Sequence, residues 1–502
     1  MGSSRVGTHR AGSSGEVEVV TGQGELRPPG QGMLKAVGAE TVVISLGQNT
    51  YLWAICMVAA LGGLLFGYDW VVIGGAKPFY EKFFELRNGS EQGWAMSCAL
   101  LGCLLGAVFS GSASDRYGRK ILLILAALLF GVSSVGTALA QVFHHFVMWR
   151  IVGGMAIGLA SNLSPMYIAE ISPAAVRGKL VSLNQLTIVM GILLAQFVNW
   201  LIAQPVPRDA SAMEILNSWN GQMGWRWMFG VTAIPSLLFF LGMLAVPESP
   251  RWLARNGRHD EAERILRRLG GEAHSKQALA EIRSSLATSK KVNLFALLDS
   301  RLVGVLSLGV SLAVFQQWCG INVIFSYAEE VFSAAGYHVS DILLNIVITG
   351  AVNLAFTLVA IALVDKVGRR KLMLFGSAAL ALIYGLVGFG FYRHSRGVHM
   401  LLLVVVAIAC YAMSLAPITW VVISEIFPNH IRGAAMSVAV TSLWIASFIL
   451  TYTFPILNRG VGPAGTFWIY AGICLAGFLF IRWRLPETKG QTLEEIEQAL
   501  AS

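Results

Sequence analysis

Long apolar stretches constrain this sequence more than any other feature. Between about residues 51 and 485 we count twelve stretches of mostly apolar residues, each long enough to cross roughly 30 Å of hydrocarbon as an α-helix. With 55% hydrophobic and only 13% charged residues, the chain excludes a soluble enzyme, a secreted scaffold and a nucleic-acid binder. We therefore predict an all-α membrane protein with spans near 51–75, 93–113, 121–140, 146–168, 181–203, 226–246, 302–335, 341–364, 372–391, 399–424, 433–457 and 465–485.

Basic residues gather on one side of the predicted spans. If both termini share a side, that side holds 28 of the 37 Lys and Arg residues. By the positive-inside rule we expect both termini in the cytoplasm of a multi-pass protein of the cell (inner) membrane. The expected domains are a disordered tail (1–48), a six-helix bundle (49–246), a small cytoplasmic helical bundle (247–300), a second six-helix bundle (301–485) and a cytoplasmic tail (486–502).

The two sets of six spans repeat one another. DRYGRK at 115 recurs as DKVGRR at 365, EISPAAVRG at 170 as EIFPNHIRG at 425, and PES at 247 as PET at 486. Parallel repeats of six helices, with a site at their interface, are typical of transporters that work by alternating access. The acids and arginines of these loops can hold the cytoplasmic ends of the halves shut, although each loop alone is also explained by topology and snorkelling charges. The gate candidates are Asp115, Arg119, Glu170, Arg177, Glu248, Arg251, Asp365, Arg369, Glu425 and Arg432.

An ordered set of motifs resembles a known family. It comprises the two loop motifs, GGLLFGYDWVVIGGA at 62, PMYIAEISPAAVRG at 165, PESPRWL at 247, FQQWCGINVIFSY at 315, VDKVGRR at 364, PITWVVISEIFPNHIRG at 417 and PETKG at 486. These motifs resemble the sugar porter family of the major facilitator superfamily, including bacterial proton/xylose-type symporters and facilitative glucose transporters. The resemblance covers nearly everything after residue 50, and it implies transport of a monosaccharide.

Amides in the seventh span suit a sugar. Gln316, Gln317 and Asn322 can share a broad face around a loosened turn, and amides both donate to and accept from hydroxyls. Pro417 precedes Trp420 by three residues, so a broken helix can aim the indole at the same site. Hydrogen bonding between helices and interfacial anchoring are the alternative explanations.

The resemblance implies further contacts with a hexose or pentose. Gln185, Asn353 and Trp420 match family positions that bind sugar, as do the three amides of the seventh span. Phe66, Tyr327 and Trp444 are assigned to the same site. Leu443, before Trp444, sits where relatives often carry an amide, and Ser326 replaces a tyrosine common before Tyr327, so the identity of the sugar stays open.

Asp69 is the one acid well embedded in an early span. It lies about 27 Å above the cytoplasmic start of the first helix, and Arg150 lies at comparable depth, about 6 Å below the outer surface. Either charge alone is expensive there, so we expect the two to pair. If the pair opens, the isolated carboxylate favours its protonated form, which would couple proton entry to transport. A static ion pair that fixes helix packing is the alternative. The family resemblance agrees with coupling, because proton-coupled members carry an aspartate at this position.

The sequence thus predicts a proton-driven monosaccharide importer that works by alternating access, with an uncoupled facilitator as the second hypothesis and a membrane sugar sensor as a weaker third. It predicts no enzyme, no cofactor, no metal site and no nucleic-acid partner. The expected partners are the sugar, the proton and the lipid bilayer, and we expect a monomer to be functional.

Overall fold

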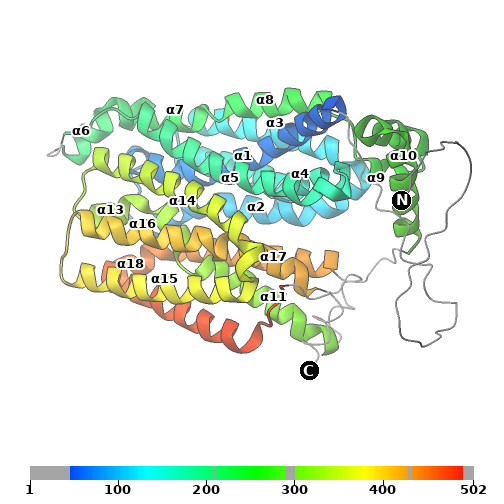
Figure 1. Ribbon diagram of the computed structural model, residues 1–502. Coiled ribbons are helices and arrows are strands. Elements are labelled where there is room, and N and C mark those ends of the chain that lie inside the picture. The colour runs from blue at the N-terminus through cyan, green and yellow to red at the C-terminus, as the bar shows by residue number, and fades with distance from the viewer. Residues whose placement is uncertain (1–45, 208–209, 289–299, 428–431, 490–502) are drawn as a thin grey trace, which may run out of the picture. The chain divides into compact units, whose positions relative to one another are not determined.

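The described part of the chain folds into helices joined by loops. The structure, a computed structural model, describes residues 46–207, 210–288, 300–427 and 432–489. Helices joined by loops and turns make up these ranges, without a strand (Figure 1). The predicted tail at 1–48 lies almost entirely outside them, since the first helix begins at Leu46.

The helices that end before residue 246 form what we call the N-terminal half. They are α1 (Leu46–Phe83), α2 (Gly89–Tyr117), α3 (Arg119–Ala138), α4 (Phe143–Ile171), α5 (Ala174–Ile202), α6 (Ala212–Asn217), the π-helical segment η1 (Asn220–Gly224), α7 (Trp225–Gly230) and α8 (Ala233–Ala245). The first span was predicted to end at residue 75, but α1 continues for two further turns and so carries Lys77 and Glu81 inside the helix.

The helices that begin at residue 300 or later form the C-terminal half. They are α11 (Ser300–Trp318), α12 (Ile321–Ser326), α13 (Ala328–Ala334), α14 (Val339–Val367), α15 (Arg369–Tyr392), α16 (Val398–Met413), α17 (Leu415–Ile426) and α18 (Arg432–Arg484). The seventh predicted span is broken into α11, α12 and α13, and the tenth into α16 and α17.

The apolar helices are long enough to cross a membrane twelve times. Eleven helices of the described chain are long and apolar enough to cross a membrane, by length and composition. The last of them, Ala434–Arg484, has 51 residues and a length of about 77 Å, more than twice the hydrocarbon thickness. Gly462 interrupts it with a non-helical φ of 72°, so it contains two crossings. The predicted all-α fold with twelve membrane helices is therefore confirmed.

Two helices lie between the two halves in the sequence and pack against each other. These are α9 (Pro250–Arg255) and α10 (His259–Thr288), the latter interrupted at Gly271. Leu253, Leu266 and Leu279 are buried together between them, so this pair of helices has a small apolar core of its own. The pair lies at the opposite end of the helices from α6 and α13 (Figure 1).

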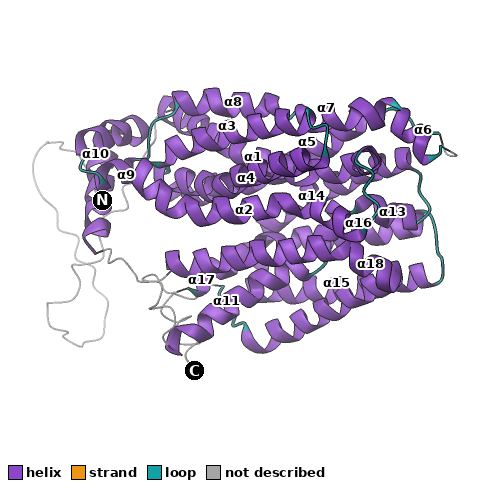
Figure 2. Cartoon of the chain, turned by 180° about the vertical axis from the view of Figure 1, so that it is seen from behind, coloured by secondary structure: helices purple, strands orange, loops and turns teal. Residues whose placement is uncertain are grey.

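The two halves pack along three seams. Contacts run from α2 to α18, from α5 to α14, and from α1 to α12 and α13. Figure 2 shows the same arrangement from behind, with α1 to α8 on one side and α15 to α18 on the other. Residues far apart in the sequence therefore meet where the repeats face each other.

Glycine allows α2 and α4 to approach closely within the N-terminal half. A Cβ atom on Gly102 of α2 would lie 2.1 Å from the carbonyl oxygen of Ile151, and one on Gly154 of α4 would lie 1.9 Å from that of Ala99. Small residues permit such backbone contact in membranes, where packing replaces the hydrophobic effect between helices. This close contact holds α4, and with it Arg150, against α2.

We expect Gly102→Ala to destabilise the protein by about 1–3 kcal/mol, because the added methyl group overpacks a backbone contact. The matched control is Gly111→Ala on the same helix, where a Cβ atom would meet nothing within 4 Å. The measurement is thermal loss of the monodisperse protein in detergent. Equal melting temperatures for the two variants would contradict the close packing of α2 on α4.

Candidate functional site

A buried ion pair joins α1 and α4. Arg150 Nη1 lies 2.8 Å from Asp69 Oδ1, and Nη2 donates to the backbone carbonyl of Asp69 at 3.4 Å. The two side chains are 4% and 8% exposed. Asp69 Oδ2 and Arg150 Nε are buried without a hydrogen-bond partner. One carboxylate oxygen is thus held by the guanidinium, and the other is not.

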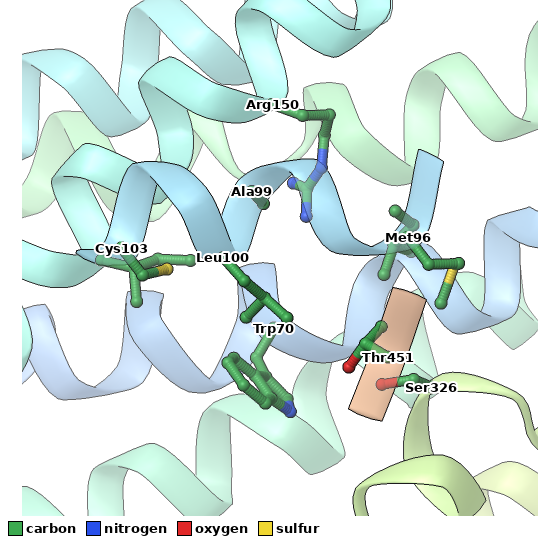
Figure 3. A pocket seen from close by; sticks show the side chains of 10 residues that line it. Trp70, Met96, Ala99, Leu100, Cys103, Arg150, Ser326 and Thr451 are labelled. Carbon is green, nitrogen blue, oxygen red and sulfur yellow. The ribbon is translucent and has the colours of Figure 1, made fainter. Parts of the chain in front are cut away.

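A cavity of about 20 Å³ lies beside this pair. That volume is enough for one water molecule, and the polar groups around it suit one. In Figure 3 the Arg150 guanidinium lies among residues of the N-terminal half, with Ser326 and Thr451 of the C-terminal half nearby. The lining residues are Trp70, Ile73, Met96, Ala99, Leu100, Cys103, Arg150, Ile157, Ser326 and Thr451. The ion pair therefore borders the seam between the halves.

Three amides of the seventh span are brought together. Gly320, with a φ of 87°, separates α11 from α12 and lets Asn322 turn back toward the preceding helix. Asn322 Nδ2 donates to Gln317 Oε1 at 2.6 Å, and Gln317 Nε2 donates to Gln316 Oε1 at 2.9 Å. Gln316 Nε2 reaches the carbonyl oxygen of Ala416 at 3.4 Å. All three side chains are buried and satisfy one another, and hydroxyl groups could replace these bonds.

Aromatic side chains meet across the seam. The ring centroids of Phe66 and Trp444 lie 6.1 Å apart, and Trp70 lies 5.9 Å from Phe66 and 5.8 Å from Trp444. Trp444 Nε1 is buried without a hydrogen-bond partner, so it has a free donor. The Tyr327 hydroxyl donates to the carbonyl oxygen of Thr451 at 2.6 Å, and its ring lies 4.5 Å from that of Phe454 at a tilt of 39°, so its contact with a sugar stays a prediction.

The remaining predicted sugar contacts are more dispersed. Asn353 on α14 is buried, while Gln185 on α5 and Trp420 on α17 are half-buried. Among the hydrogen bonds of the described residues, none joins these three side chains to the amides of the seventh span. Their convergence on one ligand stays a prediction.

The loop motifs of the N-terminal half form a charge cluster. Arg119 Nε lies 3.0 Å from Glu170 Oε2, and Asp115 lies 3.5 Å from Arg119 and 2.7 Å from Arg255. Glu248 accepts bonds from the backbone N–H groups of Arg119 and Lys120. Burial raises the pKa of Glu248, and these backbone bonds oppose the rise by favouring the carboxylate.

The repeat builds the same cluster in the C-terminal half. Arg369 lies 3.3 Å from Glu425, and Glu487 accepts a bond from the backbone N–H of Arg369 at 2.8 Å. Ser249 donates to Glu170 and Thr488 donates to Glu425, each at 2.5 Å. Gly118 and Gly368 have φ values of 96° and 102°, which let each glutamate approach the turn where a side chain would obstruct it.

These ion pairs close each cluster within its own half. We predicted that the acids and arginines of these loops hold the two halves together at the cytoplasmic side, and a contact between the two clusters stays a prediction. Arg177 and Arg251 are exposed. The side chains of Asp365 and Arg432 lie outside the described residues.

Sequence reasoning missed three features. Glu487 equals Glu248 in position and contacts, and the recurrence of PES as PET was the signal that could have found it. Gln196 on α5 is 1% exposed, with both amide atoms lacking a hydrogen-bond partner. Lys77 is 2% exposed and contacts three carboxylates. Lys77 was missed because the first span was ended before it.

The fold and buried polar site define a multi-spanning transporter rather than an enzyme, and comparison with known proteins agrees. Residues 55–500 match the family model "Sugar (and other) transporter". The chain is 41% identical over 481 residues to the D-xylose-proton symporter of Escherichia coli (strain K12), covering 90% of this chain and 96% of that protein. It is 40% identical over 445 residues to the arabinose-proton symporter of Bacillus subtilis (strain 168), covering 88% and 94%.

Solved structures resemble it as well. The inward-open conformation of the xylose transporter from E. coli matches with a TM-score of 0.78 and 39% identity, covering 89% of this chain and all of that one. The proton:xylose symporter bound to 6-bromo-6-deoxy-D-glucose matches with a TM-score of 0.74 and 39% identity, covering 90% and all of that chain. The chain belongs to the sugar transporter family, and the predicted family resemblance is confirmed.

We expect Arg119→Met to destabilise the protein by about 3–5 kcal/mol, because it leaves the largely buried carboxylate of Glu170 unpaired. Arg255→Met is the control, since its ion pair with Asp115 is 41% and 45% exposed and should contribute no more than about 1 kcal/mol. Thermal unfolding of both variants in detergent measures the difference. Similar losses would show that Arg119 does not hold this cluster.

Proposed function

We propose that this protein is a proton-coupled monosaccharide symporter of the cell's inner membrane that works by alternating access. The buried Asp69–Arg150 pair, with one unpartnered carboxylate oxygen, is the observation that carries the proposal. The similarity to symporters of D-xylose and arabinose supports it.

Asp69 carries the proton in this mechanism. While Arg150 stays at 2.8 Å, its charge stabilises the carboxylate. If rocking of the halves moves Arg150 away, the carboxylate is left in a medium of low dielectric constant, where an isolated charge is expensive. It then binds a proton from the open side and gives it up when the pair forms again. At 100 mV, inside negative, each proton supplies about 2.3 kcal/mol, enough for roughly fiftyfold accumulation of sugar.

The sugar site lies between the amides and the aromatic side chains. Sugar hydroxyls replace the bonds that Gln316, Gln317 and Asn322 now make to one another, and Gln185 and Asn353 add amides from α5 and α14. The indoles of Trp420 and Trp444, with Phe66, cover the C–H faces of the ring. Tyr327, between α12 and α13, supports this site through its bond to Thr451 rather than by direct contact with the sugar in the described conformation.

Alternating access follows from the repeat. We place both termini, α9 and α10 on the cytoplasmic side, which the excess of basic residues in those loops supports. The charge clusters around Arg119 and Arg369 are the gate components of the two halves. In the described conformation, the ion pairs given for each cluster lie within one half. We propose that a monomer is functional within the bilayer.

We expect Asp69→Asn to abolish uphill uptake while sugar exchange across the membrane persists, because asparagine cannot release a proton yet leaves the sugar amides intact. The assay uses proteoliposomes without an imposed gradient, and external pH is recorded when xylose or arabinose is added. The wild type should alkalinise the outside, and Asp69→Asn should not.

Asp260→Asn on the exposed face of α10 is the matched control and should keep the wild-type signal. If the wild type exchanges sugar but moves no protons, the protein is an uncoupled facilitator and the symport proposal is wrong. Loss of exchange in Asp69→Asn would instead assign this residue to sugar binding or packing.

We expect Gln317→Ala to weaken sugar binding at least about tenfold, equivalent to about 1.4 kcal/mol, because Gln317 is the central member of the amide chain. Titration of the purified protein with xylose, glucose, galactose and arabinose, followed by tryptophan fluorescence, measures the affinity. Gln277→Ala on α10 is the control, since that amide is exposed. Unchanged affinity in Gln317→Ala would remove the seventh span from the sugar site.

A further inference from the structure

A second buried group of charges lies on α1 beyond the proton site. Lys77 follows Asp69 by eight residues, about 12 Å along the helix and away from α9 and α10. Its Nζ atom lies 3.1 Å from Glu81 Oε1 and 3.5 Å from Glu329 Oε2, and it forms a closer ion pair with Glu330. We call Lys77, Glu81, Glu329 and Glu330 the Lys77 cluster.

The Lys77 cluster spans the seam between the halves. Lys77 and Glu81 belong to α1, whereas Glu329 and Glu330 belong to α13. The lysine side chain is 2% exposed, so its charge depends on these partners rather than on water. Separation of α1 from α13 would leave Lys77 with Glu81 alone. The cluster therefore favours the conformation in which this end of the protein is shut.

A series of hydrogen bonds connects Glu81 of the Lys77 cluster to α2 and α18. Gln92 Nε2 donates to Glu81 Oε2 at 3.3 Å, and Arg459 Nη2 donates to Gln92 Oε1 at 2.7 Å. Arg459 Nη1 also donates to the backbone carbonyl of Arg87 at 2.8 Å. The contacts thus run from the C-terminal half through α1 and α2 and back to the C-terminal half. At the loop end, by contrast, the described ion pairs stay within single halves.

The charges of the cluster do not balance. The ammonium group of Lys82 on α1 interacts electrostatically with the carboxylates of Glu329 and Glu81, and it donates a hydrogen bond to the carbonyl oxygen of Pro78. Two phenols also lie by the cluster: the Tyr327 ring is 5.8 Å from the Lys77 ammonium, and Tyr80 interacts electrostatically with Glu81, Glu330 and Arg150. Three carboxylates therefore face two ammonium groups, and Glu330 Oε2 is buried without a hydrogen-bond partner. One added proton would remove the excess negative charge.

We propose that the Lys77 cluster is a second proton-binding site, which takes up one proton from the outer solution as α13 closes on α1. This inference rests on the proposed function for its direction, because an importer must shut its outer side after the external proton and sugar have bound. Closing takes up a proton, so acid on the outer side favours the shut state. Asp69 then carries the transported proton, and protonation of the Lys77 cluster controls when α13 closes on α1.

Hydrogen exchange followed by mass spectrometry tests this in the full-length protein in nanodiscs. After correction for the intrinsic pH dependence of amide exchange, the outer ends of α1 and α13 should become more protected as the pH falls from 8 to 6. Uptake of one proton limits the change to about tenfold for each pH unit. No change in protection with pH would overturn the proposal.

Two variants separate the parts of the cluster. Glu329→Gln removes the excess negative charge but leaves the closer ion pair of Lys77 with Glu330. In this variant the outer ends of α1 and α13 should be protected from exchange already at pH 8, and their protection should change little with pH. Lys77→Met should lose protection at both pH values. Glu85→Gln on the same side, with a 70% exposed carboxylate, should behave as the wild type. If Lys77→Met does not fold, Glu329→Gln alone decides, and a wild-type pH response in that variant refutes the site.

Asp69→Asn separates this inference from the proposed function. The pH response of α1 and α13 should persist in Asp69→Asn, because the two groups of charges are distinct. If the response disappears with Asp69, the proton belongs to Asp69 and the Lys77 cluster is not a second site. If sugar moves no protons in the wild type but the pH response is present, symport fails while the second site stands.

Discussion

An unpaired charge inside a membrane is expensive, and this constraint explains where the charged residues of the protein meet. Asp69 and Arg150 come from helices that are neighbours in space but 81 residues apart in sequence, and they satisfy each other at 2.8 Å. Lys77 is surrounded by carboxylates for the same reason. In the functions that we propose, a proton substitutes for a missing counter-charge in both places, so that a change in helix packing becomes a change in proton occupancy.

Duplication supplies a second organising feature. Arg119, Glu170 and Glu248 in one half correspond to Arg369, Glu425 and Glu487 in the other, down to the hydroxyl groups of Ser249 and Thr488 that bond to the central glutamates. A glycine with positive φ brings each terminal glutamate onto a turn between two helices. The duplication did not preserve charge everywhere, because the GYD of the first helix corresponds to GIN in the seventh. One half carries the ion pair and the other carries the amides.

The two ends of the molecule differ in how the halves are joined. At the end with α9 and α10, the described ion pairs stabilise each half separately. At the opposite end, Lys77 and Arg459 connect the halves through buried and exposed polar contacts. A transporter that alternates its access needs contacts of unequal strength at its two ends, and their balance must shift with bound ligands. The proton site that we propose at the Lys77 cluster would give this balance a dependence on protons.

The sequence by itself determined the twelve crossings, the six-plus-six repeat, the place of Asp69 within the first membrane helix and the position of the amides. Hydrocarbon imposes these through local rules, since every span must be apolar and every embedded polar residue must have a reason to be there. Only the tertiary structure decided that Asn322 bonds to Gln317, that Tyr327 turns to Thr451, that the loop clusters stay within halves, and that Lys77 meets Glu329 and Glu330. These contacts join segments separated by as many as 253 residues (330 − 77) or by a break in a helix, and no local pattern specifies how such segments pack.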